Sequence, residues 1–520
     1  MSAIIEKKKK CVVIGSGLGG LSCGAVLSSN GYDVTVLEQQ AQIGGCLQCF
    51  YRNGVKFETG MHFIGSADRG QVLDRLLRFL GIRDGLQLSR LDENAYDIVA
   101  LGGSRFDFAN GREPFIERMS GYFPSERDNL ARYYSIVSSI AEASRFHSEE
   151  CVDTDVVLNT EYQLRSINDV LDELITDPLL KEVLVGSLPL YAAVKDKTPF
   201  SLHAFITDFY NKSAFRIKGG SDLVGKLIVE RIESFGGKVL NRKRAVRIVC
   251  NDSRAVGVET EDGSFYDADI VVSAIDPRAC MNLIDSKIIR PAFKSRIASL
   301  KSTVGGFTVY LVFKEGMMPY MNSNLYGYSG SPWGCESYVG DEWPKGYLYM
   351  HFADAEGLRD AGGAADAGAS GNAGKGFAKA GAIISYMNIA DLERWSGTVS
   401  GARGGDYERF KREHAIRLIA EVEKTCPGLS ACIETFYTST PLTYRDYNGT
   451  PHGALYGIAK DVTLGPAGRV SHKTKIPNLL LAGQSINSHG ILGVLVGSVV
   501  ACSEVLGSDV VLNEIRRANI

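Results

Sequence analysis

The sequence predicts an α/β fold in which a parallel sheet, assembled from discontinuous segments, is interleaved with an α+β domain. Three observations lead to this prediction. A glycine-rich strand–turn–helix–strand unit stands near the N-terminus, an α/β pattern returns at residues 218–277, and a strand, a glycine turn and an apolar helix follow residue 477. The stretches between these blocks have the patterns of long helices and of separate strands.

The first block, Cys11–Glu38, has the pattern of a Rossmann unit. Cys11–Ile14 is a short apolar run typical of a buried strand, Leu18–Ser28 is small and apolar like a helix packed on a sheet, and Asp33–Leu37 alternates like a second strand. The turn between the first strand and the helix carries the motif G-x-G-x-x-G. The motif alone is weak evidence, but with strand, helix and strand in register it predicts a dinucleotide site.

Each residue of that motif has a physical task. Gly15 permits the tight turn, Gly17 lets the backbone approach a diphosphate, and Gly20 lets helix and strand pack closely. Glu38 follows the second strand, where a carboxylate can bind ribose hydroxyls. Because the same carboxylate would repel a 2′-phosphate, NADP is disfavoured at this site.

The middle of the chain departs from this pattern. We expect a strand pair at 96–108, helices through 114–147 and most of 167–210, and strands of a second sheet at Gly305–Phe313 and Ala382–Asn388. Residues 435–457 show no period and are predicted to be irregular. The predicted domains are 1–95, 215–285 and 475–520 for nucleotide binding and 96–214 and 286–474 for the substrate, with a mobile Ala/Gly-rich insert at 361–381.

Composition excludes several classes of protein. A net charge of −3 provides no general attraction to nucleic acid, and eleven cysteines without a regular framework suit a reducing compartment. No signal peptide precedes the first strand, so we expect a cytoplasmic protein, and the lysines in MSAIIEKKKK leave open peripheral contact with a membrane. Residues 476–503 lack charge, but polar residues and glycine interrupt them, which argues against a membrane span.

Four segments together resemble the FAD-dependent phytoene desaturase, carotenoid isomerase and retinol saturase family. They are Cys11–Glu38, Gly44–Gly45, Lys218–Pro277 and Pro477–Ser498. The retinol saturase branch is the most similar, because a cysteine follows the glycine pair and Thr59–Gly65 matches its Thr-Gly-x-His-aromatic-Ile-Gly run. Phytoene desaturases usually carry arginine after that pair. Glu58 stands where the family more often has aspartate, a departure that keeps the charge.

This resemblance implies FAD as the resident cofactor in an amine-oxidase-like two-domain layout. The backbone of Val246 would receive the adenine, and the amides of Leu492 and Gly493 would meet the pyrimidine oxygen of the flavin. The residues that would hold FAD are Gly15, Gly17, Gly20, Glu38, Gly44, Gly45, Val246, Gly483, Leu492 and Gly493. A second G-x-G-x-x-G is absent from the sequence, so NAD(P)H as a transient electron donor would need an unusual site; this donor and a separate donor protein are both left open.

The resemblance also implies redox chemistry at a carbon–carbon double bond of an apolar polyene or isoprenoid, with hydride moving between flavin N5 and carbon. His62 and Tyr456 are the candidates for supplying a proton in the saturating direction. Two alternatives stay open, an amine-oxidase-like oxidation of a C–N bond and a non-catalytic FAD-binding escort protein. A redox dithiol formed by Cys46 and Cys49 is also left open. No metal-ligand spacing links the histidines, so no metal is expected. The oligomeric state is open.

Overall fold

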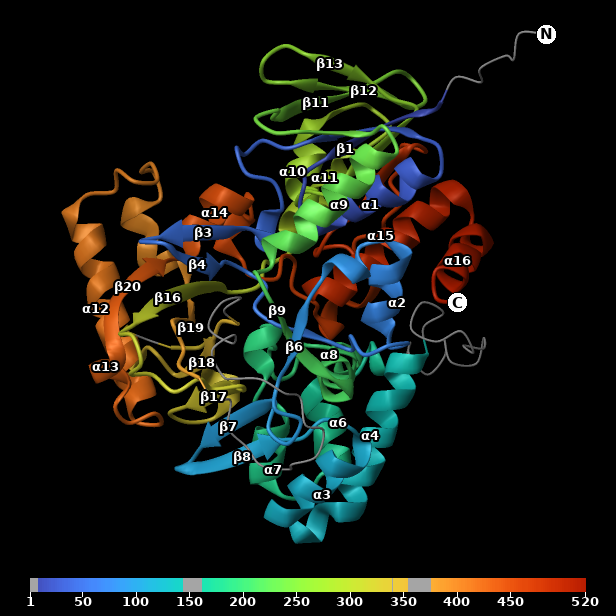
Figure 1. Cartoon of the computed structure of the whole chain (residues 1–520). Helices are drawn as coiled ribbons and strands as arrows, with labels where there is room; N and C mark the ends of the chain where they lie inside the picture. Colours follow the sequence, from blue (N-terminus) through green and yellow to red (C-terminus); the bar gives the residue numbers. More distant parts are fainter. Residues whose placement is uncertain (1–7, 144–160, 339, 354–375) are drawn as a thin grey trace.

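The protein is described by a computed structural model that covers residues 8–143, 161–338, 340–353 and 376–520 (Figure 1). Its first sheet has the strand order β10-β2-β1-β14-β21, and neighbouring strands all pair in parallel. The strands are β1 (Lys10–Ile14), β2 (Asp33–Leu37), β10 (Lys238–Leu240), β14 (Ile270–Ser273) and β21 (Leu479–Leu481). Since these strands come from three distant parts of the chain, the predicted α/β fold built from discontinuous segments is confirmed.

Two helices from opposite ends of the chain pack together beside this sheet. Helix α1 (Leu18–Ser29) lies along α15 (Gly490–Leu506), and α9 (Asp222–Ser234) lies on the other side of α1 (Figure 1). A Cβ atom at Gly19 would stand 2.9 Å from the Cα atom of Gly483. The hydroxyl of Ser498 donates to the Gly19 carbonyl at 3.2 Å. Glycine at position 19 is therefore what allows the N-terminal and C-terminal segments to meet.

A smaller sheet stands at the outer end of the parallel sheet, in the order β13-β12-β11-β15 (Figure 1). Its strands are β11 (Ala245–Cys250), β12 (Ala255–Thr260), β13 (Phe265–Asp267) and β15 (Ile284–Asp285), and α10 (Pro277–Leu283) and α11 (Pro291–Ser299) follow β14 and β15.

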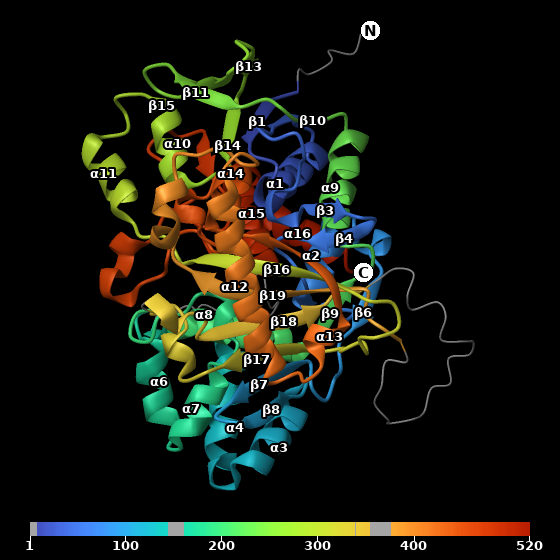
Figure 2. The ribbon, with the colours of Figure 1, turned by 90° about the vertical axis from the view of Figure 1, so that its left-hand side faces the viewer.

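The second large sheet is mixed and has the order β20-β16-β19-β18-β17-β7-β8. Only its β17–β7 pairing is parallel. Its strands are β7 (Asp97–Leu101), β8 (Ser104–Phe108), β16 (Gly305–Phe313), β17 (Asn324–Tyr328), β18 (Gly346–His351), β19 (Ala380–Met387) and β20 (Ile433–Ser439). Figure 2 shows α12 (Gly405–Glu423) crossing one face of this sheet, where its buried side chains join the same apolar cluster as Phe307 and Val309.

Two predictions about this region need correction. Residues 435–457 are not irregular, because β20 pairs with β16 and helix α14 (Pro441–Asn448) follows it. The Thr440 hydroxyl accepts from the N–H of Leu442 at 3.2 Å, which caps the helix that Pro441 begins. Of the predicted insert 361–381, residues 361–375 lie outside the described ranges, and residues 380 and 381 already belong to β19.

Helices form a separate lobe below the mixed sheet in Figure 1. They are α3 (Arg112–Tyr122), α4 (Arg127–Glu142), α6 (Ile167–Leu174), α7 (Pro178–Leu184) and α8 (Phe200–Lys212). His203 is fully buried in this lobe, with Nε2 and Nδ1 hydrogen-bonded to the hydroxyls of Tyr133 and Tyr191 at 2.7 and 2.8 Å. Burial lowers the pKa of His203 to about 3, so the imidazole is neutral. None of the described helices has the length and apolar character of a membrane span.

Short strands connect the two large sheets. The hairpin of β3 (Cys49–Arg52) and β4 (Val55–Glu58) turns at Asn53 and Gly54, whose positive φ angles of 49° and 78° suit a tight two-residue hairpin turn. Strands β5 (Ile64–Gly65), β6 (Leu88–Arg90) and β9 (Ala214–Ile217) form a three-stranded sheet.

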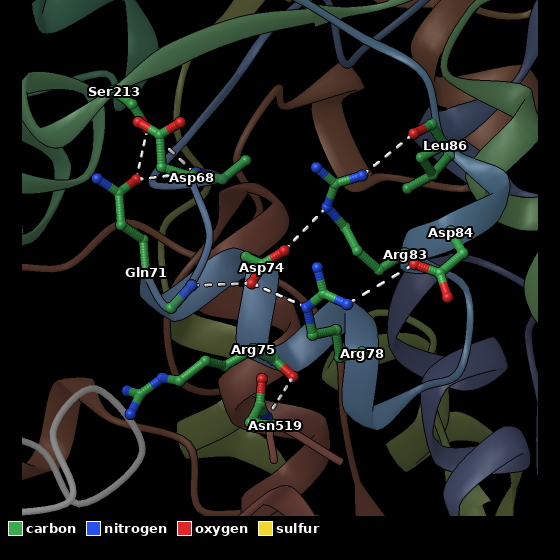
Figure 3. A network of polar contacts seen from close by, with 12 residues as sticks. Asp68, Gln71, Asp74, Arg75, Arg78, Arg83, Asp84, Leu86, Ser213 and Asn519 are labelled. Carbon is green, nitrogen blue, oxygen red and sulfur yellow. Dashed lines mark hydrogen bonds and ion pairs between the residues drawn. The ribbon is translucent and has the colours of Figure 1, made fainter.

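A buried carboxylate holds the helix α2 (Val72–Phe79) that follows β5 (Figure 3). Asp74 is 1% exposed and accepts from Nε of Arg78 and Nε of Arg83, both at 3.0 Å, and from the N–H of Gly70 at 3.0 Å. Burial by itself raises the pKa of Asp74, but these donors outweigh it and hold the pKa below its usual value.

We expect Asp74→Asn to lower the free energy of unfolding by about 3 kcal/mol, because it removes the buried anion that the guanidinium groups of Arg78 and Arg83 share. The matched control is Asp84→Asn, since Asp84 also pairs with Arg78, at 3.7 Å, but its side chain is 97% exposed, and we expect a change within about 0.5 kcal/mol. Chemical unfolding of both variants measures the difference. Because the pKa of Asp74 is lowered in the folded state, its contribution is present above the unfolded pKa and is lost as the pH falls through the folded pKa. Equal losses in the two variants would contradict this account.

Candidate functional site

The glycine turn after β1 has the shape that its sequence predicts. Gly15 has a φ of +96°, and its N–H donates to the Leu37 carbonyl of β2 at 2.8 Å. A Cβ atom at Gly20 would stand 1.9 Å from the Gly15 carbonyl oxygen and 3.1 Å from Cβ of Ala274. Gly20 therefore lets α1 lie close against the first strand and the residue that follows β14.

Gly17 differs from Gly20 in what surrounds it. A Cβ atom at Gly17 would meet no protein atom within 4 Å. The second glycine pair lies beside it, since a Cβ atom at Gly45 would stand 3.1 Å from Gly17 Cα, and the N–H of Gly44 donates to the Ser16 carbonyl at 3.1 Å. Open space next to Gly17, bordered by backbone and by the start of α1, is a cradle that fits a diphosphate.

Glu38 and Val246 lie at the two positions expected to receive the adenosine. The Glu38 carboxylate, 8% exposed, accepts from the N–H and the hydroxyl of Ser16 at 3.0 and 2.6 Å, which places it against the glycine turn. Val246 is the extra residue of a β-bulge, because Ala245 pairs with Thr260 and Arg247 with Glu259. The backbone of Val246 thus stands outside the ladder, and its side chain is 43% exposed.

The C-terminal glycines shape the segment between β21 and α15. Gly483, two residues after the end of β21, has a φ of +100° and lies against α1. Helix α15 begins at Gly490, so Leu492 lies in its first turn, where the backbone N–H has no partner within the helix, and Gly493 is the next residue. A Cβ atom at Gly493 would stand 2.6 Å from Cβ of Ser488, so the loop before the helix folds closely over its start.

A pocket of about 710 Å³ opens beside the start of α15. Helix α8 supplies one wall, α15 supplies another, and the segment 460–472 closes the third side. Most of the lining side chains are apolar: Leu190, Leu202, Phe205, Ile206, Phe209, Val462, Val470, Ile486, Leu492 and Val496. The pocket suits an elongated apolar molecule and includes Leu492 and Gly493, the residues expected to touch the flavin.

Lys460 and His489 place polar groups in this apolar lining. Lys460 donates through Nζ to the carbonyl of Ser485 at 3.1 Å, and burial lowers its pKa to about 8. His489 is 7% exposed, its Nε2 has no hydrogen-bond partner among the described residues, and burial lowers its pKa to about 3. The sequence indicates His489 only as a histidine in a glycine turn. It offers no signal for Lys460, whose place depends on tertiary packing.

His62 lies in a different part of the site. It is 9% exposed, its ring stacks on Phe352 with centroids 5.8 Å apart, and its Nδ1 stands 3.7 Å from the Glu58 carboxylate. Burial raises the pKa of Glu58, while His62 and Arg216 oppose that rise. A Cβ atom at Gly60 would stand 2.9 Å from Cβ of Cys46, so the segment carrying His62 packs against the residue after the second glycine pair.

The hydroxyl of Tyr456 already has a hydrogen-bond partner. It donates to the Pro189 carbonyl at 2.7 Å, and burial raises the pKa of the phenol well above its usual value. The Tyr456 ring packs on His489 with centroids 4.6 Å apart. His62 and Tyr456 do not belong to the lining of the apolar pocket.

The cysteines of the possible dithiol are buried thiols. Burial raises the pKa of Cys46 and of Cys49 to about 11, so both are protonated at neutral pH. Cys46 accepts from Nδ2 of Asn448 at 3.4 Å, and Cys49 lies 3.4 Å from the hydroxyl of Ser221. Reactive dithiols instead have a thiolate of lowered pKa.

Several known proteins are similar to this chain in sequence or in fold. Residues 18–331 match the family described as flavin containing amine oxidoreductase. The chain is 27% identical to all-trans-retinol 13,14-reductase of Homo sapiens, over 96% of this chain and 86% of that protein. It is 21% identical to chloroplastic prolycopene isomerase 1 of an Oncidium hybrid, over 96% and 84% of the two chains. The fold matches cyclohexylamine oxidase from Brevibacterium oxydans with a TM-score of 0.56 at 15% identity, covering 98% and 100%.

Proposed function

Because the chain belongs to the flavin-containing amine oxidoreductase family, we propose that it is an FAD-dependent oxidoreductase acting on a carbon–carbon double bond of an apolar polyene or isoprenoid. The family implies a flavin, and the open cradle at Gly17 and the bulge at Val246 fit the diphosphate and adenine of FAD. Gly15, Gly20, Glu38, Gly44, Gly45 and Gly483 would complete its binding site. The relatives named above carry retinol and prolycopene in their names.

The apolar pocket is the observation that carries this proposal. Its lining beside the start of α15 is mostly apolar, and an apolar substrate would gain binding energy along its length there. Flavin supplies hydride chemistry at N5 when it is bound. The chain's own residues would orient the double bond and stabilise negative charge at the first amides of α15.

His62 is the group that we assign as proton donor in the saturating direction; it lies outside the lining of the apolar pocket, so the reacting double bond would have to extend from that pocket to the segment that carries His62. Its imidazole stands beside the buried Glu58 carboxyl, and its Nδ1 has no hydrogen-bond partner among the described residues. Tyr456 is the weaker candidate, because its hydroxyl already donates to a carbonyl. An apolar substrate would be stored in a membrane, and peripheral attachment of a cytoplasmic protein to that membrane would give access to it.

Oxidation of an amine is the second candidate function, and the family description favours it. The pocket argues against it, because the ammonium of Lys460 and the guanidinium of Arg469 would repel a protonated amine. The carboxylate of Asp461 also lines the pocket, but it already accepts from the N–H and hydroxyl of Thr463 at 2.9 and 2.6 Å.

Anaerobic reoxidation of the flavin tests the proposal. In separate anaerobic cuvettes, all-trans-retinol or a carotene is added to the photoreduced holoenzyme, and an aliphatic amine is added to the oxidised holoenzyme. We expect a polyene to restore the absorbance of oxidised flavin and to gain two hydrogens, as mass spectrometry of the extract would show. Bleaching of the oxidised enzyme by the amine would favour C–N chemistry. A flavin that exchanges electrons with neither would favour the escort protein, and purification without any flavin would refute the account.

A further inference from the structure

We propose that a second pocket, lined by aromatic and cationic side chains, binds a nicotinamide dinucleotide that reduces the flavin. The proposal rests on the proposed function in one respect, since a flavin that saturates double bonds must itself be reduced in each cycle. The sequence contains a single G-x-G-x-x-G, and this motif, together with Glu38, is already assigned to FAD. A nicotinamide donor therefore needs a site of another kind.

The second pocket has a volume of about 590 Å³ and lies between β3, the edge strand β20, α12 and α14. It differs chemically from the apolar pocket at α15. Amide, hydroxyl and charged side chains line it beside the aromatic rings: Gln42, Gln48, Arg52, Thr59, Glu408, Lys411, Arg412, Thr438, Ser439, Thr443 and Asn448. Such a mixture suits a polar ligand with flat rings better than it suits a hydrocarbon chain.

Aromatic side chains line part of the wall. Phe50 and Tyr310 meet edge to face with centroids 4.9 Å apart, and Phe436, Tyr437, Tyr444 and Tyr447 complete this group. Tyr447 is 51% exposed, so its ring is accessible at the mouth of the pocket. Flat heterocycles such as nicotinamide and adenine stack on rings of this kind.

Two guanidinium groups provide the charge that a dinucleotide needs. Arg52 stands over the Phe50 ring at 5.4 Å from its centroid, and Arg412 stands over the Phe436 ring at 5.9 Å. Within the described part of the chain, no carboxylate lies within ion-pair distance of either, whereas Lys411 pairs with Glu408 at 2.9 Å. A guanidinium held over a ring binds phosphate through its two-pronged edge.

The pocket also touches the segments where the flavin is expected. Asn448 lines it and donates to Sγ of Cys46, the residue that follows the second glycine pair. Tyr444 lines it and donates to the carbonyl of Thr59 at 3.2 Å, three residues before His62. Apolar substrate and polar donor would thus reach the flavin through separate pockets.

The electron balance is that of a hydride transfer. The C4–H bond of the dihydronicotinamide breaks as a bond to flavin N5 forms, so the nicotinamide loses two electrons and the flavin gains two. The oxidised dinucleotide then leaves. The polyene later takes the hydride from N5 on one carbon and a proton on the other.

Binding and reduction are measured separately on the holoenzyme. NADP⁺ and NAD⁺ are titrated into the oxidised enzyme by calorimetry, and NADPH and NADH are mixed with it anaerobically while flavin absorbance is followed. We expect Arg52→Gln and Arg412→Gln each to weaken binding on the order of 10-fold, and the double variant on the order of 100-fold, with slower flavin reduction at low donor concentration. Preference between the two dinucleotides shows whether the 2′-phosphate is recognised.

Arg394→Gln is the matched control. Arg394 also stands over an aromatic ring, at 3.8 Å from the centroid of Trp395, but it lies outside both pockets, and we expect no change. Photoreduced Arg52 and Arg412 variants should still be reoxidised by a polyene at the wild-type rate. The donor site is refuted if the wild type binds neither dinucleotide, if the variants bind as the wild type does, or if a polyene loses its binding in these variants. A wild type that NADPH reduces but no polyene reoxidises would keep the donor site and overturn the proposed function.

Discussion

Gly17→Ala produces a protein that folds like the wild type but does not retain FAD. The added methyl group would enter space that no protein atom occupies within 4 Å, and the φ of −64° at Gly17 suits alanine. We therefore expect the free energy of unfolding of the apoprotein to change by less than about 1 kcal/mol. In the holoprotein the methyl group stands where the diphosphate must approach, so FAD affinity should fall on the order of 100-fold or more.

Gly20→Ala is the comparison that separates cofactor binding from folding. Its methyl group would stand 1.9 Å from the Gly15 carbonyl oxygen, so α1 must move away from the sheet. We expect this variant to lose about 3 kcal/mol of stability even without FAD. Thermal unfolding of both apoproteins, followed by titration with FAD under fluorescence detection, measures the two effects. Gly17→Ala protein that binds FAD normally, or that melts together with Gly20→Ala, would refute the assignment of the cradle.

His62→Gln is the second substitution from which we expect a large effect. Glutamine keeps a polar side chain beside Glu58 but cannot donate a proton as an acid. Removal of a general acid typically lowers turnover 10²-fold or more, so we expect the reoxidation of reduced flavin by polyene to slow on the order of 100-fold. Reduction of the flavin by light should be unchanged, because that step does not use the imidazole.

Tyr456→Phe is the matched control for His62. It removes a hydroxyl that already donates to the Pro189 carbonyl, so we expect turnover to stay within about 3-fold of the wild type. Glu58→Gln should move the pH profile of reoxidation, since it removes the carboxyl that stands 3.7 Å from His62. Stopped-flow traces across a pH series measure all three variants. A large loss in Tyr456→Phe with none in His62→Gln would reverse the two roles.

The nucleotide-binding part of the fold could be predicted because its signals are local. Cys11–Ile14, the glycine turn and Asp33–Leu37 each specify their own structure, and the structure joins them as expected. Strand β20 and helix α14 were not predictable in this way. β20 is specified by its pairing with β16 across more than a hundred residues, and α14 depends on the cap at Thr440.

The candidate site was predictable to the same extent. The spacing of Gly15, Gly17 and Gly20 indicates their roles, whereas the apolar pocket forms only where α8, residues 460–472 and α15 meet in the folded chain. No local pattern places Lys460 near His489, because each is held by its own loop. The arginines of the second pocket likewise come from β3 and α12, which only the tertiary fold brings together.

The discontinuous parallel sheet has a consequence for the biogenesis of the protein. Strand β21 completes the sheet at one edge, and contacts between α1 and α15, such as that between Cys23 and Ser498, span 475 residues. A ribosome must therefore synthesise the chain through α15, which ends at Leu506, before the flavin site can close, while the helical lobe and mixed sheet are already available to fold. FAD binds only the closed form and stabilises it by mass action. In riboflavin-starved cells, newly made chains should stay open longer and be degraded faster, so the amount of this protein should follow the vitamin supply.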